Sequence, residues 1–198
     1  MLYYLTHTAC GLEDVLRGGC RLVQLRIKDC DDEVFAAEAR AVGALCRRYG
    51  ARFIVDDRVH LVRTAGADGV HLGRNDMPPA RARQLLGRDA VIGATANTVD
   101  DIVRAAPYVD YIGLGPFRYT VTKRNLAPLL GAEGCRRVVE AARARGIDLP
   151  IVAIGGITVD DVPALRAAGV SGIAVSGAIF NASDKELITK KFIEKWKN

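Results

Sequence analysis

The sequence predicts an α/β protein of one domain, spanning residues 1–198, whose eight parallel strands close into a (β/α)8 TIM barrel. Short apolar runs of strand type alternate with helical patterns along the whole chain, and no break in composition marks a linker. The 198 residues are enough for one good core and lie at the short end for eight such units. A doubly wound open sheet is the alternative, but it would need a glycine-rich nucleotide motif where Thr6-His7-Thr8 stands.

The expected strands are short runs of β-branched, aromatic and leucine residues between turn signals. They fall at 2–5, 22–29, 53–55, 69–72, 91–94, 111–114, 150–154 and 172–175. Helical periodicity predicts helices over 11–17, 32–50, 59–64, 78–86, 98–106, 134–145 and 159–168. A C-terminal amphipathic helix over 185–197 should dock on the barrel through Leu187, Ile188, Phe192, Ile193 and Trp196.

Composition favours a globular protein that binds small molecules. Apolar residues make up 49% of the chain, and the net charge is +5. A basic chain suits nucleic acid or a phosphorylated small molecule, and scattered basic residues without a nucleic-acid motif favour the small molecule. No apolar run reaches the length of a membrane span and the start lacks the basic region of a secretory signal, so we expect a cytoplasmic protein without a membrane partner. A homo-oligomer stays open.

The five cysteines bear on the redox environment. They are odd in number and widely spaced, with no close pair of the kind that binds zinc. We therefore expect reduced thiols at Cys10, Cys20, Cys30, Cys46 and Cys135.

The stretch 22–29 alternates polar and apolar residues. On a strand, Gln24, Arg26 and Lys28 share one face, while Leu25 and Ile27 lie on the other. In a closed barrel the apolar face packs under helices and the polar face points into the lumen. Cations aimed at a barrel axis are costly unless an anion meets them, so we expect this row to bind an anionic ligand. An exposed edge strand is the alternative.

Chemistry in such barrels takes place at the carboxyl ends of the strands. Strands seven and eight end in Gly155-Gly156 and Ser176-Gly177, where backbone N–H groups and a helix amino end favour a phosphate. Thr120 and Thr122, after strand six, would add hydroxyl donors. His71 lies within strand four, and we expect it to be packed and hydrogen-bonded rather than catalytic.

Two aspartates follow neighbouring strands. Asp57 and Asp76 could share one Mg²⁺ with a polyphosphate, or each could cap the helix that follows it, and their spacing does not decide. Arg26, Lys28 and Lys123 favour the metal, because a metal and several cations at one mouth suit a pyrophosphate.

Five motifs occur in chain order: Gln24-Leu25-Arg26-Ile27-Lys28, Asp56-Asp57-Arg58, Ala67-Asp68-Gly69-Val70-His71-Leu72-Gly73, Gly115-Pro116 with Thr120-Val121-Thr122-Lys123, and Val152-Ala153-Ile154-Gly155-Gly156-Ile157. Each is generic alone. The ordered set, within residues 24–179, resembles the thiamine phosphate synthase family, also called thiamine-phosphate pyrophosphorylases.

This resemblance implies a TIM-barrel transferase that joins 4-amino-2-methyl-5-(diphosphooxymethyl)pyrimidine to a thiazole phosphate and releases pyrophosphate. The residues it implies for the pyrimidine diphosphate are Gln24, Leu25, Arg26, Ile27, Lys28, Asp56, Thr95 and Lys123. Those it implies for the thiazole phosphate are Thr120, Val121, Thr122, Gly156, Ser176 and Gly177. Mg²⁺ would be the cofactor, on Asp57 and Asp76. Arg26, Lys28 and Lys123 are the expected catalytic residues, because they would stabilise charge on the departing pyrophosphate.

Four positions depart from the family pattern. Asp56 stands in place of asparagine, Arg74 of glutamine, Thr95 of serine and Gly177 of serine. A carboxylate at position 56 would repel pyrophosphate unless a metal or Arg58 neutralises it. Arg118, in a segment that also differs from the family, would add a further cation.

Two rival functions stay open. A thiazole tautomerase of the same superfamily would isomerise the thiazole phosphate without using the diphosphate, and Lys28, Asp57 and Asp76 argue against it. A non-catalytic regulator would keep the barrel and bind phosphate only.

Overall fold

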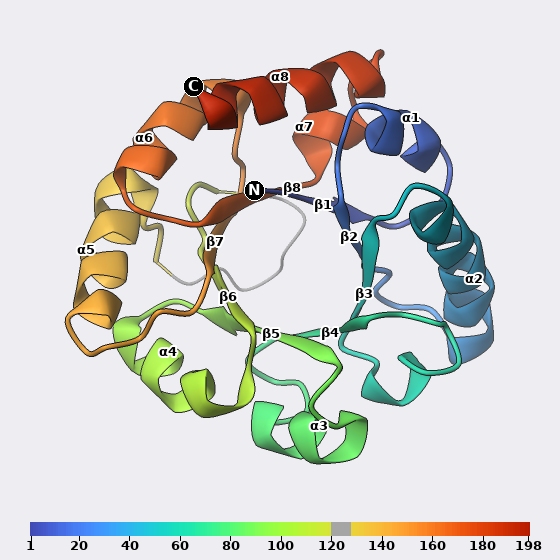
Figure 1. Ribbon diagram of the computed structural model, residues 1–198, viewed down its shortest axis with the longest axis horizontal. Helices are drawn as coiled ribbons and strands as arrows, with labels where there is room; N and C mark the ends of the chain where they lie inside the picture. Colours follow the sequence, from blue (N-terminus) through green and yellow to red (C-terminus); the bar gives the residue numbers. More distant parts are fainter. Residues whose placement is uncertain (120–127) are drawn as a thin grey trace.

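The computed structural model, which describes residues 1–119 and 128–198, has eight parallel strands in a closed barrel (Figure 1). The strands neighbour one another in chain order, and the barrel closes where β8 pairs with β1. The eight strands are β1 (Leu2–Thr6), β2 (Leu22–Leu25), β3 (Arg52–Asp56), β4 (Gly69–Leu72), β5 (Val91–Ala96), β6 (Tyr111–Leu114), β7 (Ile151–Ile154) and β8 (Gly172–Val175). The predicted TIM barrel is therefore confirmed.

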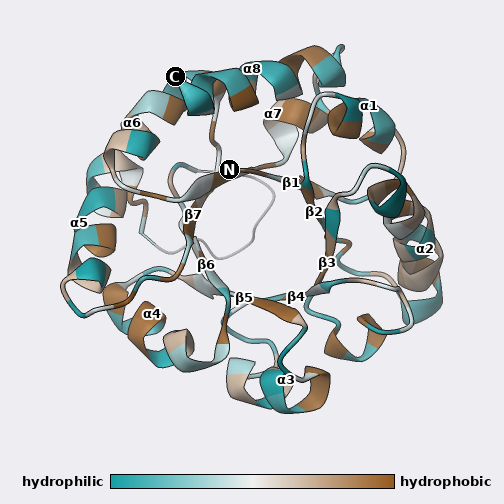
Figure 2. Cartoon of the chain, viewed as in Figure 1, coloured by the Kyte–Doolittle hydropathy of each residue, from teal (hydrophilic) through white to brown (hydrophobic). Residues whose placement is uncertain are grey.

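The helices form a ring outside the strands (Figure 1). The α-helices are α1 (Leu12–Arg17), α2 (Asp32–Arg48), α3 (Pro79–Leu86), α4 (Val99–Ala105), α5 (Gly131–Arg143), α6 (Val162–Ala167), α7 (Gly177–Phe180) and α8 (Lys185–Lys197). The connections within the described residues also contain three short 3₁₀ helices, namely η1 (Val59–Leu61), η2 (Ala106–Tyr108) and η3 (Val159–Asp161). Most helices of the ring carry both hydrophobic and hydrophilic residues (Figure 2), as expected for elements with one face on a core.

The strand alternation divides the core into two parts. Between strands and helices lies the larger apolar core, which includes Val23, Leu25 and Phe35. A smaller cluster fills the lumen, formed by Tyr3, Leu5, Ile54, Tyr111, Val152 and Ala174. Polar side chains share the lumen with it, and their arrangement is the subject of the site below.

Several element boundaries differ from the prediction. Strand β2 ends at Leu25, because the chain leaves the barrel there and Arg26 contributes only its N–H, to the carbonyl of Thr6. Strand β5 continues to Ala96, so Thr95 lies inside a strand. The helix predicted over 59–64 is reduced to the single turn of η1.

The C-terminal helix docks on the barrel as predicted, with one exception. Phe192 is fully buried, and Ile188, Ile193 and Trp196 pack against the same core. Leu187 was expected on this apolar face but is 48% exposed. Thr189 takes its place in the interior and is completely buried.

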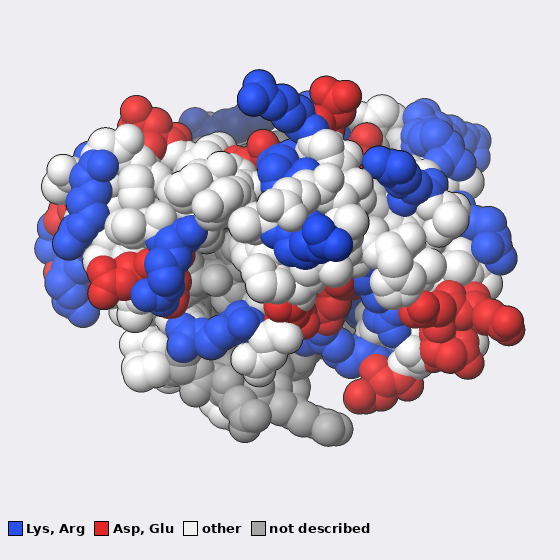
Figure 3. Space-filling view, turned by 90° about the horizontal axis from the view of Figure 1, so that it is seen from below, with Lys and Arg blue, Asp and Glu red and all other residues white. Residues whose placement is uncertain are grey.

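The surface carries both signs of charge. On the face drawn in Figure 3, the Lys and Arg side chains are interspersed with Asp and Glu. Within the described residues, no helix combines the length and apolar character needed to cross a membrane. The five cysteines all lie in described segments and form no disulfide, and Cys20, Cys46 and Cys135 are buried.

Candidate functional site

Gln24 marks the lumen face of β2. Its side chain is only 2% exposed, and its Nε2 donates a hydrogen bond of 2.9 Å to the hydroxyl of Tyr3. The flanking Val23 and Leu25 are fully buried on the other side of the strand, within the outer core. The predicted alternation therefore holds over β2 itself. Leu25 contributes packing there rather than a polar side-chain contact.

Two cations and two carboxylates meet where β2 and β3 end. Asp56 is the last residue of β3 and is nearly buried, and its Oδ2 lies 3.3 Å from Arg26 Nε and 3.0 Å from Lys28 Nζ. Lys28 also pairs with Asp57. In the described part of the chain, Asp56 Oδ2 has no partner in hydrogen-bond geometry, so these are ion pairs without good alignment.

Arg58 has a different task from the one expected of it. It was a candidate to neutralise Asp56, but its Nη1 donates to the carbonyl of Ile27 at 3.1 Å and its Nη2 to that of Cys30 at 2.7 Å. Its Nε donates to Asp32. The Arg58 guanidinium therefore clamps the loop that carries Lys28, whereas Arg26 and Lys28 themselves neutralise Asp56.

Asp57 and Asp76 follow β3 and β4, which are neighbours in the barrel. Neither side chain caps the next helix: η1 and α3 have Arg58 and Pro78 at their N-cap positions, without a side-chain cap. Asp76 Oδ2 instead accepts from the N–H of Gly73 at 2.6 Å. The capping alternative is thus wrong. Carboxylates at adjacent strand ends are oxygen ligands of the kind that Mg²⁺ binds together with phosphate and water. The described residues contain no group of three or more metal-ligating side chains, so a metal on these two aspartates would need such additional ligands.

Thr95 and His71 are joined in the lumen. His71 Nε2 lies 3.0 Å from Thr95 Oγ1, and His71 Nδ1 lies 3.0 Å from the hydroxyl of Tyr111. The expectation of a packed, hydrogen-bonded His71 is confirmed. Thr95 is half-buried, and in the strand register it lies two residues beyond Gly93, the partner of His71, toward the carboxyl ends of the strands.

The residues of the predicted phosphate site follow β7 and β8. Gly156 adopts φ +61°, and a Cβ there would come within 2.9 Å of the carbonyl oxygen of Tyr119, so only glycine allows this close approach. Ser176 is the N-cap of α7 and Gly177 is its first residue. A Cβ on Gly177 would meet nothing closer than 3.6 Å, so the departure from serine costs no space.

Two arginines near the site have other partners. Arg118 forms a two-pronged ion pair with Asp161, at 2.7 and 2.9 Å, and donates to the carbonyl of Gly156. Asp161 thus neutralises the cation expected to serve the site. Arg74 reaches Asp101 at the start of α4. The remaining predicted residues, Thr120, Val121, Thr122 and Lys123, lie outside the described residues.

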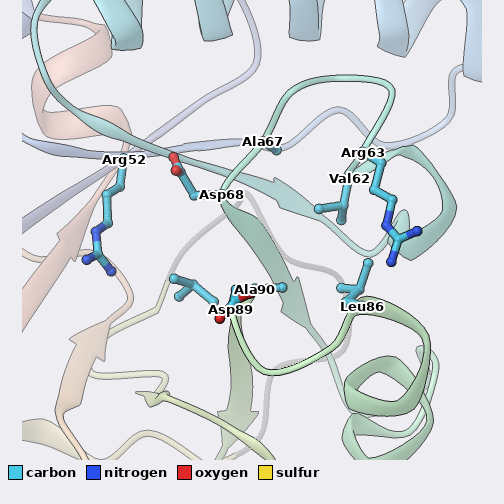
Figure 4. A pocket seen from close by; sticks show the side chains of 9 residues that line it. Arg52, Val62, Arg63, Ala67, Asp68, Leu86, Asp89 and Ala90 are labelled. Carbon is cyan, nitrogen blue, oxygen red and sulfur yellow. The ribbon is translucent and has the colours of Figure 1, made fainter.

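A pocket of about 380 Å³ lies at the opposite end of the barrel. Figure 4 shows side chains from the amino ends of β3, β4 and β5 around it. It mixes two arginines with two aspartates, and the lining residues are Arg52, Val62, Arg63, Ala67, Asp68, Leu86, Asp89, Ala90 and Val91. It contains none of the predicted site residues, and chemistry in TIM barrels takes place at the other end.

Sequence reasoning missed the tyrosines of the lumen. Tyr3 and Tyr111 both bear hydroxyls within the barrel and contact each other at 2.9 Å. Tyr3 is followed by Tyr4, so alternation alone does not say which of the two faces inward. Tyr111 lies two residues before Gly113 and so shares its strand face. Glycines on that face were the available signal that large rings fill the lumen.

Comparison with known proteins agrees with this geometry. The model of the thiamine monophosphate synthase family matches residues 5–179. A thiamine-phosphate synthase of Phocaeicola vulgatus is 49% identical over 179 residues, which is 90% of this chain and 86% of that protein. Its counterpart in Bacteroides fragilis is 46% identical over 90% of this chain and 88% of its own length. The solved thiamine phosphate pyrophosphorylase from Pyrococcus furiosus superposes with a TM-score of 0.88 at 31% identity, covering 99% of this chain and 95% of that one. The chain belongs to the thiamine monophosphate synthase family.

Proposed function

We propose that the chain is a thiamine-phosphate synthase. It joins 4-amino-2-methyl-5-(diphosphooxymethyl)pyrimidine to a thiazole phosphate or to its carboxylated form, and it releases pyrophosphate. The observation that carries the proposal is the convergence of Arg26 and Lys28 on Asp56 and Asp57 at one end of the barrel. Family membership over residues 5–179 supports it.

The residues divide the work by chemistry. Breaking the bond to the pyrimidine methylene places negative charge on pyrophosphate, and Arg26 and Lys28 would stabilise it, with Lys123 assigned the same task by resemblance. The diphosphate oxygens would compete with Asp56 for both cations. The aminopyrimidine can delocalise the positive charge left on its methylene, so the thiazole nitrogen attacks without a strong base. A site rich in cations and without a nucleophilic triad fits this reaction.

The metal and the second substrate are assigned to the flanking strand ends. Asp57 and Asp76 would hold Mg²⁺, which when bound neutralises pyrophosphate charge. Gly156, Ser176 and Gly177 would bind the thiazole phosphate through backbone N–H groups and the Ser176 hydroxyl, together with Thr120, Val121 and Thr122. Gln24 and Thr95 would contact the pyrimidine. Leu25 and Ile27 complete the stretch assigned to it.

The test is a coupled assay for pyrophosphate release with both substrates and Mg²⁺. We expect pyrophosphate and thiamine phosphate in equal amounts, and neither product from one substrate alone. Lys28→Ala should lower the rate, while Lys190→Ala, which removes an exposed lysine that pairs with Glu186 on the same helix, should not. Isomerised thiazole without pyrophosphate would favour the tautomerase, and binding without turnover would favour the regulator; either result would overturn the proposal.

A further inference from the structure

A continuous chain of hydrogen bonds crosses the lumen of the barrel. It runs from Gln24 Nε2 to the hydroxyl of Tyr3 at 2.9 Å, on to the hydroxyl of Tyr111 at 2.9 Å, and to His71 Nδ1 at 3.0 Å. The last link joins His71 Nε2 to Thr95 Oγ1 at 3.0 Å. The chain thus connects Gln24 on β2 with Thr95 on β5, the two residues assigned above to the pyrimidine.

The barrel reserves space for this chain. In the strand register, Gly93 stands between His71 and Tyr111. A Cβ on Gly93 would lie 2.0 Å from Cζ of Tyr111, and a Cβ on Gly113 would lie 2.9 Å from Cε1 of His71. Any larger residue at either glycine would displace a ring of the chain, so the lumen is built around these rings.

The direction of the chain follows from its amide end. The Gln24 amide nitrogen only donates, so the Tyr3 hydroxyl accepts that hydrogen bond. The Tyr3 hydroxyl in turn donates its own hydrogen bond to the hydroxyl of Tyr111. Burial raises the pKa of both tyrosine hydroxyls, which therefore keep their protons. Tyr111 then donates to His71 Nδ1. The reverse direction would leave the buried Tyr3 proton without an acceptor among the described residues, which is unfavourable for a buried hydroxyl.

The chain therefore sets the polarity of both its ends. His71 carries its proton on Nε2 and donates it to Thr95 Oγ1, so the hydroxyl proton of Thr95 is directed to another acceptor. At the other end, the amide orientation of Gln24 leaves its Oε1 as an acceptor. One acceptor on β2 and one donor on β5 match a 4-aminopyrimidine, which offers an amino donor and ring-nitrogen acceptors.

The geometry points to Tyr3, Tyr111 and His71 as positioning residues that hold Gln24 as an acceptor and Thr95 as a donor, so that the site selects an aminopyrimidine over its 4-oxo analogue. This inference rests on the proposed function, because it concerns the same pyrimidine site. A 4-oxo ring in its lactam form replaces the amino donor with a carbonyl acceptor and the adjacent ring acceptor with an N–H. The fixed polarity would leave both groups unpaired.

The experiment compares Tyr111→Phe and Tyr3→Phe with the wild type and with Tyr4→Phe. Tyr4 is equally buried but belongs to the outer core, so its variant loses a buried tyrosine hydroxyl outside the chain. For each protein, kcat/KM is measured with the 4-amino and the 4-oxo pyrimidine diphosphate. We expect Tyr111→Phe to reduce the preference for the amino substrate by about tenfold, with the KM for thiazole phosphate unchanged. Tyr4→Phe should keep the preference within about twofold.

A second readout does not depend on turnover. The ¹⁵N shifts of His71 in the wild type should show protonated Nε2 and unprotonated Nδ1, and Tyr111→Phe should shift the ring toward a mixture of tautomers. A proton on Nδ1 in the wild type, an unchanged substrate preference in Tyr111→Phe and Tyr3→Phe, or an equal loss in Tyr4→Phe would each overturn the inference. If the wild type couples neither pyrimidine to the thiazole phosphate, the proposed function is overturned instead. The ¹⁵N measurement of the His71 tautomer would then still test the direction of the hydrogen-bond chain.

Discussion

At the scale of single residues, Asp56 neutralises two cations at the mouth of the barrel, Arg26 and Lys28. Arg26 and Lys28 both lie beside Oδ2 of Asp56, at 3.3 and 3.0 Å, so their positive charges repel each other. The nearly buried Asp56 carboxylate offsets that repulsion. Burial also removes the water that would hydrate the Asp56 carboxylate in the unfolded chain. Its ion pairs with the two cations offset this desolvation cost. The aspartate at position 56 thus supplies an internal counter-ion for the two cations.

Asp57 and Asp76 give a first prediction. Asp57 sits at φ +62°, a left-handed conformation that Asn tolerates better than Ala, so Asp57→Asn removes the charge with little backbone strain. We expect Asp57→Asn and Asp76→Asn each to lower kcat/KM about 100-fold or more at fixed Mg²⁺, equivalent to roughly 3 kcal/mol of lost stabilisation. Titration of activity with Mg²⁺ checks this. The exposed Asp100→Asn is the control, and normal activity of either variant at low Mg²⁺ would contradict the shared site.

Thr189 gives a second prediction at this scale. Its hydroxyl is fully buried, and it has no hydrogen-bond partner within the described residues. Thr189→Val keeps the shape and removes the unpaired group, so we expect stability to rise by about 1 kcal/mol. Urea unfolding of the two proteins measures this difference. A loss of stability would mean that the hydroxyl is satisfied, for example by water.

At the scale of elements, the strands and their order were predictable, whereas the ends of several elements were not. β4, β6 and β8 match their predicted bounds because continuous apolar runs end there at turn residues. β2 was predicted too long because alternation continues through Arg26, Ile27 and Lys28 after the backbone has left the barrel. The alternation of residues along a sequence does not show where a strand stops pairing with its neighbouring strands. Contacts between distant residues, such as the clamp by Arg58, were invisible for the same reason.

The loop between β2 and α2 depends on that clamp. Arg58 bonds the carbonyls of Ile27 and Cys30 and stacks over Phe35, with its Cζ 4.4 Å from the ring centroid. Lysine has the charge but cannot reach several acceptors in one plane. We expect Arg58→Lys to raise the KM for the pyrimidine diphosphate about tenfold and to leave the KM for thiazole phosphate unchanged.

The control for this prediction is Arg63→Lys. Arg63 is exposed and donates only to the carbonyl of Leu85 among the contacts seen, so its replacement should leave both KM values unchanged. If Arg58→Lys raised both KM values equally and also lowered the melting temperature, the arginine would support the fold as a whole and not the loop.

Helix α4 predicts a pH dependence of stability. Asp101 closes its capping box with Thr98, and although partial burial raises the pKa of Asp101, hydrogen bonds from Asn97 and Thr98 together with Arg74 bring it below the ordinary value of 3.8. A lowered pKa in the folded state means stability that is present above the unfolded pKa and is lost as pH falls through the folded one. Asp101→Asn should therefore cost about 1 kcal/mol at pH 7 and progressively less below about pH 4. Thermal unfolding from pH 7 to pH 2.5 tests this, and a constant difference across that range would be the contrary result.

At the scale of the whole molecule, the two ends of the chain meet at one seam. β1 pairs with β8, and α8 lies beside α1 and α6 over that seam (Figure 1). Close packing between α1 and α8 is enforced at Gly18, where a Cβ would come within 2.7 Å of Cβ of Thr189. Because the barrel is closed only by the β1–β8 ladder, its stability depends on the helix that covers it.

Phe192 gives the prediction for this scale. It is fully buried at the centre of α8, so Phe192→Ala leaves a cavity under the helix and should cost about 3–5 kcal/mol in the free energy of unfolding. Leu187→Ala on the same helix removes a half-exposed side chain and should cost no more than about 0.5 kcal/mol. Urea titration followed by circular dichroism should show one transition with a lower midpoint and an unchanged slope for Phe192→Ala. A biphasic curve would mean that α8 detaches while the barrel stays closed, and the seam would then hold through the strand pairing alone.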